Sequence, residues 1–291
     1  MFVKKILVIK FLPIIFILLW SSAFITTKPI VDYSDPFTAL SLRFLIVFAG
    51  FFLFSYFSND KIINRSKNFL SSIGTGVLFH GFYLGGVFYS ISIGLPTNIA
   101  ALIVTLQPIL TNALAGPLLK EKITLNRWIG VILGFVGAVL VIGLDIGKSL
   151  PQEGIISAFV ALLAVTFATL WQKKISTNLS LPVNNMYQAI GGCIFHLLII
   201  LLFIQEPFII FTTTFVIAIS HQILLVSFGA FTILMFLIKK NSASKTVSLF
   251  FLIPPTSAIM AWIFLNETFN IIDIIGFIVA TLGVYIATRE N

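Results

Sequence analysis

The residues of this sequence that could bind a small molecule are isolated polar side chains inside long apolar runs. His80 and Tyr83 are three residues apart, and His221 directly precedes Gln222. Residues three apart lie on one face of a helix, and histidine exchanges protons near pH 6.5. Since polar groups are costly against lipid, we predict that these four side chains line a cavity. The alternative for His80 and Tyr83 is hydrogen bonding to neighbouring helices.

Further residues bear on the same cavity. Gln107 is predicted to line it, and Trp20, near the centre of the first apolar run, could wall the substrate path. Arg43 is seven residues into the second run, where a buried arginine costs about 2.5–3.5 kcal/mol. It could attract an anionic group, bind carbonyls at a bend or reach the headgroups; we interpret it as a structural polar residue. His196, alone in an apolar run, is also interpreted as structural.

One outline occurs near the end of each half of the chain: a proline, an acidic residue and two glycines. The spacings are 13, 9 and 7 residues, then 12, 9 and 7, over Pro108, Glu121, Gly130 and Gly137, and over Pro255, Glu267, Gly276 and Gly283. Duplication in a very apolar chain is typical of transporters. We expect the glycines to pack between helices. Glu121 and Glu267 are predicted to accept amide hydrogens at the N-terminus of the next helix, a structural role.

The prolines are predicted to lie in the middle of membrane helices. Within a helix, proline removes an amide donor and frees the carbonyl four residues back, here that of Val104 for Pro108 and of Phe251 for Pro255. Pro254 is the neighbour of Pro255. The three prolines could be hinges or helix breaks beside the cavity, or static kinks, which membrane helices tolerate.

Composition excludes a water-soluble fold. The chain of 291 residues is 58% hydrophobic and 10% charged, with 31 phenylalanines, against about 25% charged residues in soluble domains. Its net charge of +8 comes from short basic clusters between apolar runs, so we expect no nucleic-acid partner. Cys193 is the single cysteine, and neither a disulfide nor a metal site nor a cofactor is expected.

Ten apolar windows of about 18–24 residues are long enough to cross a bilayer. The first follows three lysines without a cleavage motif and is interpreted as a retained helix rather than a signal peptide. We therefore predict an all-α integral membrane protein with ten transmembrane helices. The windows are residues 11–29, 36–57, 70–93, 97–119, 125–144, 154–174, 183–204, 214–237, 244–266 and 270–288.

The distribution of positive charge predicts the orientation. With the N-terminus inside, 15 of the 18 lysines and arginines lie on the cytoplasmic side, as the positive-inside rule requires. Both termini are then cytoplasmic. Each half, residues 11–144 and residues 154–288, has five helices, and an odd number makes the two halves inverted repeats.

The pattern resembles the ten-helix EamA-type members of the drug/metabolite transporter superfamily. The resemblance lies in Trp20-Ser21-Ser22-Ala23-Phe24, in Leu42-Arg43-Phe44, in residues 89–137 and in Pro254-Pro255, Asn266-Glu267-Thr268, Gly276 and Gly283. It implies exporters or importers of amino acids, other metabolites or drugs. It also implies a central cavity formed mainly by helices one, three, four, six, eight and nine. The second half departs from the first, with Gln188 at about the place of Arg43 and no clear Trp-Ser-Ser.

Together these patterns predict an alternating-access transporter in the bilayer of the cell membrane, or of the bacterial cytoplasmic membrane if the source is bacterial. Scarce buried charge favours a small neutral, zwitterionic or amphipathic substrate over a polyanion. The alternatives are an intramembrane enzyme, for which no H-E-x-x-H or G-x-S-x-G motif exists in the sequence, and a non-transporting membrane assembly protein. The oligomeric state is not set by the sequence.

Overall fold

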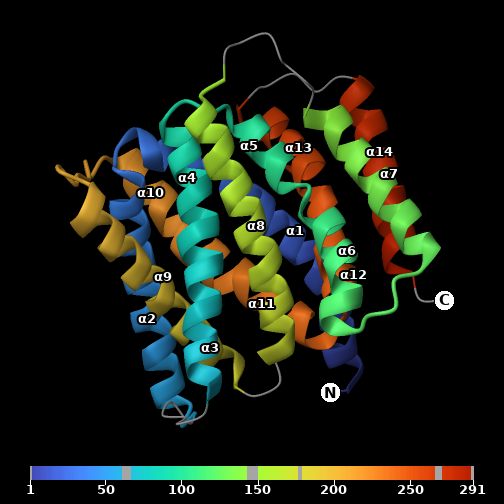
Figure 1. Cartoon of the computed structure of the whole chain (residues 1–291), viewed down its shortest axis with the longest axis horizontal. Helices are drawn as coiled ribbons and strands as arrows, with labels where there is room; N and C mark the ends of the chain where they lie inside the picture. The colour runs from blue at the N-terminus through green and yellow to red at the C-terminus, as the bar shows by residue number, and fades with distance from the viewer. Residues whose placement is uncertain (1, 61–66, 143–149, 176–178, 266–270, 290–291) are drawn as a thin grey trace.

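The computed structural model describes residues 2–60, 67–142, 150–175, 179–265 and 271–289, and over these it is a bundle of helices (Figure 1). The described residues contain no strand, only an isolated bridge between Ser34 and Ile209. The helices up to residue 142 are α1 (Phe2–Asp32), α2 (Pro36–Phe57), α3 (Lys67–Gly76), η1 (Val77–Leu84), α4 (Gly85–Ser92), α5 (Thr97–Val104), α6 (Gln107–Leu119) and α7 (Leu125–Ile142). Those that follow are α8 (Gln152–Ile175), α9 (Leu181–Phe203), α10 (Thr213–His221), η2 (Gln222–Ala230), α11 (Phe231–Lys240), α12 (Ala243–Val247), η3 (Ser248–Leu252), α13 (Ile253–Leu265) and α14 (Ile271–Thr288).

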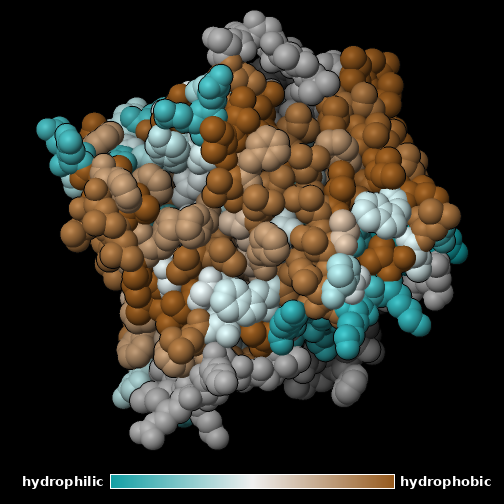
Figure 2. Space-filling model, viewed as in Figure 1, coloured by the Kyte–Doolittle hydropathy of each residue, from teal (hydrophilic) through white to brown (hydrophobic). Residues whose placement is uncertain are grey.

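Seven stretches of the described chain are long and apolar enough to cross a membrane. They are residues 11–32, 36–57, 99–119, 152–175, 181–203, 213–240 and 271–288. The other three predicted windows are occupied by α3, η1 and α4, by α7, and by α12, η3 and α13. Hydrophobic side chains cover the middle of the face seen in Figure 2, as expected for a surface in contact with lipid.

Two interruptions of the α-helical hydrogen bonding occur at corresponding places. The π-helices η1 and η2 begin at Val77 and Gln222, an offset of 145 residues, close to the offset of about 146 in the repeated sequence. A π-helix bonds residue i to residue i+5 and is frequent at functional sites. No residue type predicts a π-helix, so these two segments were not predicted from the sequence.

Pro108 lies in the middle of the membrane-spanning stretch 99–119, as predicted, but at the start of a separate α-helical segment, α6. α5 ends at Val104, a turn at Thr105 and Leu106 follows, and Pro108 is in the first turn of α6. In the second half, the 3₁₀-helix η3 precedes α13, whose second and third residues are Pro254 and Pro255. A proline in the first turn has no helical amide bond to lose. The α-helical hydrogen bonding is therefore interrupted at each proline site, although the backbone keeps right-handed helical angles.

The repeated glycines form the contact between α7 and α14, which run side by side in Figure 1. A Cβ atom added at Gly137 would lie 2.6 Å from the carbonyl oxygen of Gly276, and one added at Gly283 would lie 2.7 Å from that of Gly130. The first glycine of each pair thus meets the second glycine of the other pair, and the two helices are antiparallel. Only glycine permits backbones to approach this closely.

Glu121 caps a helix, but a different one from the predicted helix. Its Oε1 accepts the amide hydrogen of Ala243 at 2.7 Å, and its Oε2 accepts the Ser244 hydroxyl at 2.8 Å and the Ser244 amide at 3.4 Å. The capped helix is α12, far along the chain, whereas the prediction named the next helix, α7. The carboxylate neutralises the positive end of α12. Glu267 lies outside the described residues.

Candidate functional site

A small cavity lies between residues of the two halves. Its walls come from α1, α2, η1, α4, η2 and α11. They are formed by Trp20, Ala23, Phe24, Thr27, Arg43, Phe79, His80, Tyr83, Leu84, Val87, Phe88, Gln222, Val226, Ser227 and Phe231. The cavity measures about 40 Å³, the volume of roughly three water molecules, whereas small-molecule sites measure about 300–1,000 Å³. The cavity is therefore smaller than a typical small-molecule site.

Arg43 is the charged residue of the cavity wall. Its side chain is buried, with 3% of the residue exposed. Nε donates to the Ser227 hydroxyl at 2.9 Å, and Nη1 donates to Oε1 of Gln222. The structure therefore excludes the headgroup contact considered for Arg43, because its partners lie inside the protein. No carboxylate forms an ion pair with Arg43 among the described residues.

The π-helix η2 explains how one element supplies both partners of Arg43. Gln222 and Ser227 are five residues apart, which in an α-helix would put them about 140° apart around the axis. The wider turn of a π-helix, with its i to i+5 bonding, brings such residues closer to one face. The sequence pointed to Gln222 but missed Ser227, since the α-helical periodicity assumed for this segment does not group the two.

Gln222 also ties the cavity wall to α1. Its Nε2 lies 3.2 Å from the Ala23 carbonyl, 3.2 Å from the Thr26 hydroxyl and 3.1 Å from the Thr27 hydroxyl. The adjacent His221 faces the same helix, with Nε2 at 3.1 Å from the Ser22 hydroxyl and Nδ1 at 3.4 Å from that of Thr26. These hydroxyls were not predicted as site residues, although Ser22 belongs to the Trp-Ser-Ser stretch that the sequence singled out.

His80 lies in the cavity wall among aromatic rings. Its ring centroid is 4.3 Å from that of Phe44 and 4.5 Å from that of Phe231. Its Nδ1 is buried and has no hydrogen-bond partner among the described residues. His196 is not isolated, because its Nε2 lies 3.0 Å from the His80 carbonyl oxygen. His196 thus supports the backbone that carries His80.

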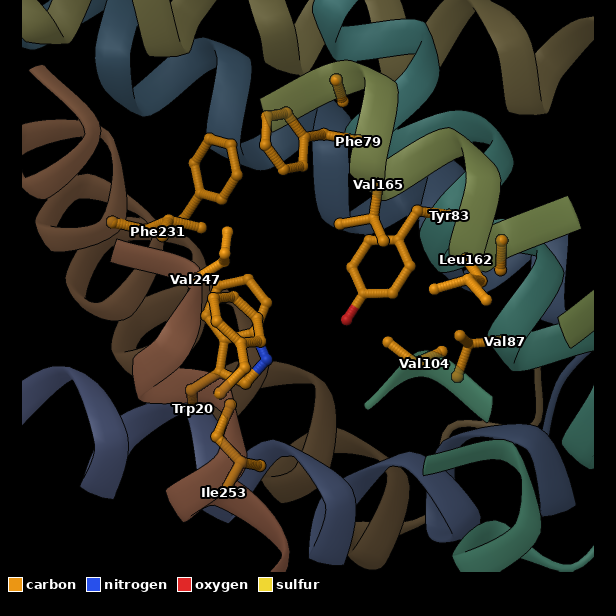
Figure 3. Packing of buried hydrophobic residues seen from close by; sticks show 14 of the residues in the cluster. Trp20, Phe79, Tyr83, Val87, Val104, Leu162, Val165, Phe231, Val247 and Ile253 are labelled. Carbon is orange, nitrogen blue, oxygen red and sulfur yellow. The ribbon is translucent and has the colours of Figure 1, made fainter. Parts of the chain in front are cut away.

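Trp20 and Tyr83 lie on opposite walls and point toward one another (Figure 3). Trp20 is fixed by Phe16 and Phe250, whose ring centroids lie 5.3 Å and 5.4 Å from its own. Tyr83 projects from η1, one turn after His80. The structure therefore brings Trp20, His80, Tyr83 and Gln222 to one cavity, while their role in binding stays a prediction.

Other predicted residues lie away from this cavity. Gln107 is fully buried, but its Nε2 donates to the Thr169 hydroxyl at 3.0 Å on α8, and it does not line the cavity. Pro108, Pro254 and Pro255 do not line it either. His221 does not line it either, and its ring nitrogens lie against the Ser22 and Thr26 hydroxyls of α1. Helix α8 packs beside α6 and provides the hydrogen-bond acceptor for the Gln107 amide.

Seven apolar stretches long enough to cross a membrane, packed around a small and mainly apolar cavity that contains a buried arginine, define a multi-pass membrane protein. The EamA-like transporter family model matches the chain over residues 7–143 and again over residues 152–289. The chain belongs to this family, as the sequence predicted.

Proteins similar in sequence carry transporter names. The uncharacterized transporter YvbV of Bacillus subtilis (strain 168) is 24% identical over 94% of this chain and 90% of its own length. A probable amino-acid metabolite efflux pump of Salmonella typhimurium is 21% identical over 95% and 93%. A crystal structure with 19% identity superposes with a TM-score of 0.81 and covers 96% of both chains, so the fold is shared with it.

Proposed function

We propose that this protein is an alternating-access transporter of ten transmembrane helices, built from two inverted repeats, residues 11–144 and residues 154–288, with both termini in the cytoplasm. The contact between α7 and α14 carries the proposal. In it, Gly130 meets Gly283 and Gly137 meets Gly276. Such a reciprocal, antiparallel contact is what a two-fold axis between two copies produces. An axis of this kind in the membrane plane relates inverted repeats.

The cavity supports the same proposal. Its wall contains residues of both halves, and its volume of about 40 Å³ is small for a metabolite, as expected for a state in which the substrate path is narrowed. Rocking of one half against the other would open it to each side in turn. The lining and the relatives support as substrate a small amino-acid-like, neutral, zwitterionic or amphipathic solute, moved across the cell membrane.

Thiol accessibility tests alternating access. In a Cys193→Ser background, Ala23→Cys places a thiol in the cavity wall. We expect a membrane-impermeant maleimide to label it both in right-side-out and in inside-out vesicles, because each open state exposes the cavity to one side. Labelling from one side only, in protein that is folded, would contradict alternating access.

Two surface positions serve as controls for that experiment and test the orientation. Ser92→Cys, at the end of α4, is expected to react only from outside. Lys120→Cys, after α6, is expected to react only from inside. Both residues are exposed, so their labelling requires no conformational change. The reverse pattern would overturn the proposed topology while leaving the access test readable.

The interruptions of α-helical hydrogen bonding at the prolines are proposed as hinges. Pro108→Ala and Pro255→Ala should allow the neighbouring helices to join, since alanine restores the amide and favours helix. We expect each substitution to lower the rate of solute counterflow in proteoliposomes about tenfold, which corresponds to about 1.4 kcal/mol in the barrier, with little change in the thermal midpoint. Unchanged counterflow in both variants would show that the interruptions are static.

A further inference from the structure

Arg43 has an unusual set of partners for a buried cation. Its two hydrogen bonds go to the neutral oxygens of Ser227 and Gln222. They engage Nε and Nη1, and Nη2 has no hydrogen bond among the described residues. A guanidinium has five donors in a planar fork that matches a carboxylate. The protein thus holds a cation at the cavity wall with donors to spare.

We infer that Arg43 binds the carboxylate of an amphipathic monocarboxylate, which is the transported solute; this rests on the transporter function proposed above. Nη2 is the first donor available to the carboxylate. Nη1 becomes the second when its bond to Gln222 is exchanged for the solute, which makes a bidentate pair. Gln222 keeps its bonds to α1 through Nε2, so the exchange leaves the wall intact.

The rest of the lining defines the body of the solute. Phe79, Leu84, Val87, Phe88, Val226 and Phe231 present apolar surface. Among the described residues, no aspartate or glutamate lines the cavity. A second carboxylate would therefore face an apolar wall, and an ammonium group would meet only neutral oxygens close to the Arg43 cation. One carboxylate on an apolar body fits both features.

The exchange also links binding to the contact between halves. Arg43 belongs to α2 in the first half, and both of its partners belong to η2 in the second. Without solute, Arg43 holds η2 directly. With solute, the carboxylate takes one of these bonds, so one contact between α2 and η2 is released when the cavity is filled. A solute without a carboxylate leaves that contact in place.

Matched acids and amides test the inference on the detergent-solubilised full chain. The probes are 4-methylpentanoate with 4-methylpentanamide, and 3-phenylpropionate with 3-phenylpropanamide, at equal ionic strength. A ligand that binds the native state raises the thermal midpoint. We expect an acid to be bound about tenfold or more tightly than its amide, because charge-assisted hydrogen bonds are the stronger ones. Equal shifts for acid and amide, or no shift with either acid, would overturn the inference.

Variants at the site separate recognition from folding. Arg43→Gln should abolish the preference for the acid. Ser227→Asp gives Arg43 an internal carboxylate, so we expect folded protein that no longer responds to the acids, whereas the equally large Ser227→Asn should keep the preference. Lys28→Gln removes an exposed cation that is paired with Asp32 and is the control for net charge. A preference that survives in Ser227→Asp would overturn the inference even if Arg43→Gln fails to fold.

The accessibility experiment with Ala23→Cys uses no solute. It therefore distinguishes a failure of the transporter proposal from a failure of the carboxylate site. Labelling from both sides without any preference for acids would retain the transporter and refute the carboxylate site. Labelling from one side would refute the transporter and, with it, transport of a carboxylate.

Discussion

Gly137→Leu is expected to prevent α7 and α14 from packing. A Cβ atom at this position would lie 2.6 Å from the carbonyl oxygen of Gly276 and 2.8 Å from the Cα of Ala280. Both are backbone atoms, which cannot rotate away as a flexible side chain can. The helices must separate along their length, so we expect a loss of about 3 kcal/mol or more. For a chain of this size that lowers the thermal midpoint by at least about 6 °C, measurable by tryptophan fluorescence in detergent.

Gly116→Ala is a control for the loss of a helical glycine, since Gly116 also lies within a membrane helix, α6. The nearest atom to its added Cβ is the Glu121 carbonyl oxygen, at 3.8 Å. Here alanine meets ordinary van der Waals contact, and we expect no loss or a gain of about 0.5–1 kcal/mol from the lower flexibility of the unfolded chain. Equal midpoints for Gly137→Leu and Gly116→Ala would show that the close contact is not limiting for stability.

The glycine contact illustrates what the sequence could and could not predict. The two glycines of each half are seven residues apart, which places them on one face of a helix. Their small size indicates close packing. Spacing carries no information about the partner, so the pairing of Gly130 with Gly283 came only from the structure. The same holds for Glu121, whose carboxylate finds α12 instead of the neighbouring helix.

The site was predicted in its residue types more than in its contacts. Because polar side chains are costly in contact with lipid, the sequence pointed to His80, Tyr83 and Gln222. All three line the cavity. Gln107 has the same chemistry, but it bonds to Thr169 instead, because polar residues on α8 offer it a closer partner. The bond of Arg43 to Gln222 joins residues 179 positions apart. It depends on the π-helix η2, which has no signature in the sequence.

Gln222→Leu is expected to be the most damaging substitution in the cavity wall. It removes one of the two partners of Arg43 and the bonds that Nε2 makes to α1. A hydrogen bond to a charged group contributes about 1.5–3 kcal/mol, and a buried charge left without its partner costs more than a neutral group does. We therefore expect a loss of about 3 kcal/mol, visible as a lower thermal midpoint and poor yield in detergent.

Gln107→Leu provides the control with the same change of side chain. Gln107 is equally buried, but its partner is the neutral Thr169 hydroxyl, and its Oε1 already has no hydrogen-bond partner among the described residues. Its replacement should cost about 1 kcal/mol or less. If Gln107→Leu and Gln222→Leu destabilise the protein equally, the charge of Arg43 does not determine the effect.

The double variant Arg43→Met with Gln222→Leu tests whether the hydrogen-bonded pair of Arg43 and Gln222 serves the stability of the fold or the binding of a solute. Replacing a buried polar network by apolar side chains of similar size is often neutral or stabilising, whereas removing one partner is not. We expect the double variant to be more stable than Gln222→Leu alone and to show no response to carboxylates. A protein that folds better without Arg43 does not need it for its structure, so the residue must be retained for what enters the cavity. If the double variant is as unstable as the sum of the single changes, Arg43 supports the fold in its own right.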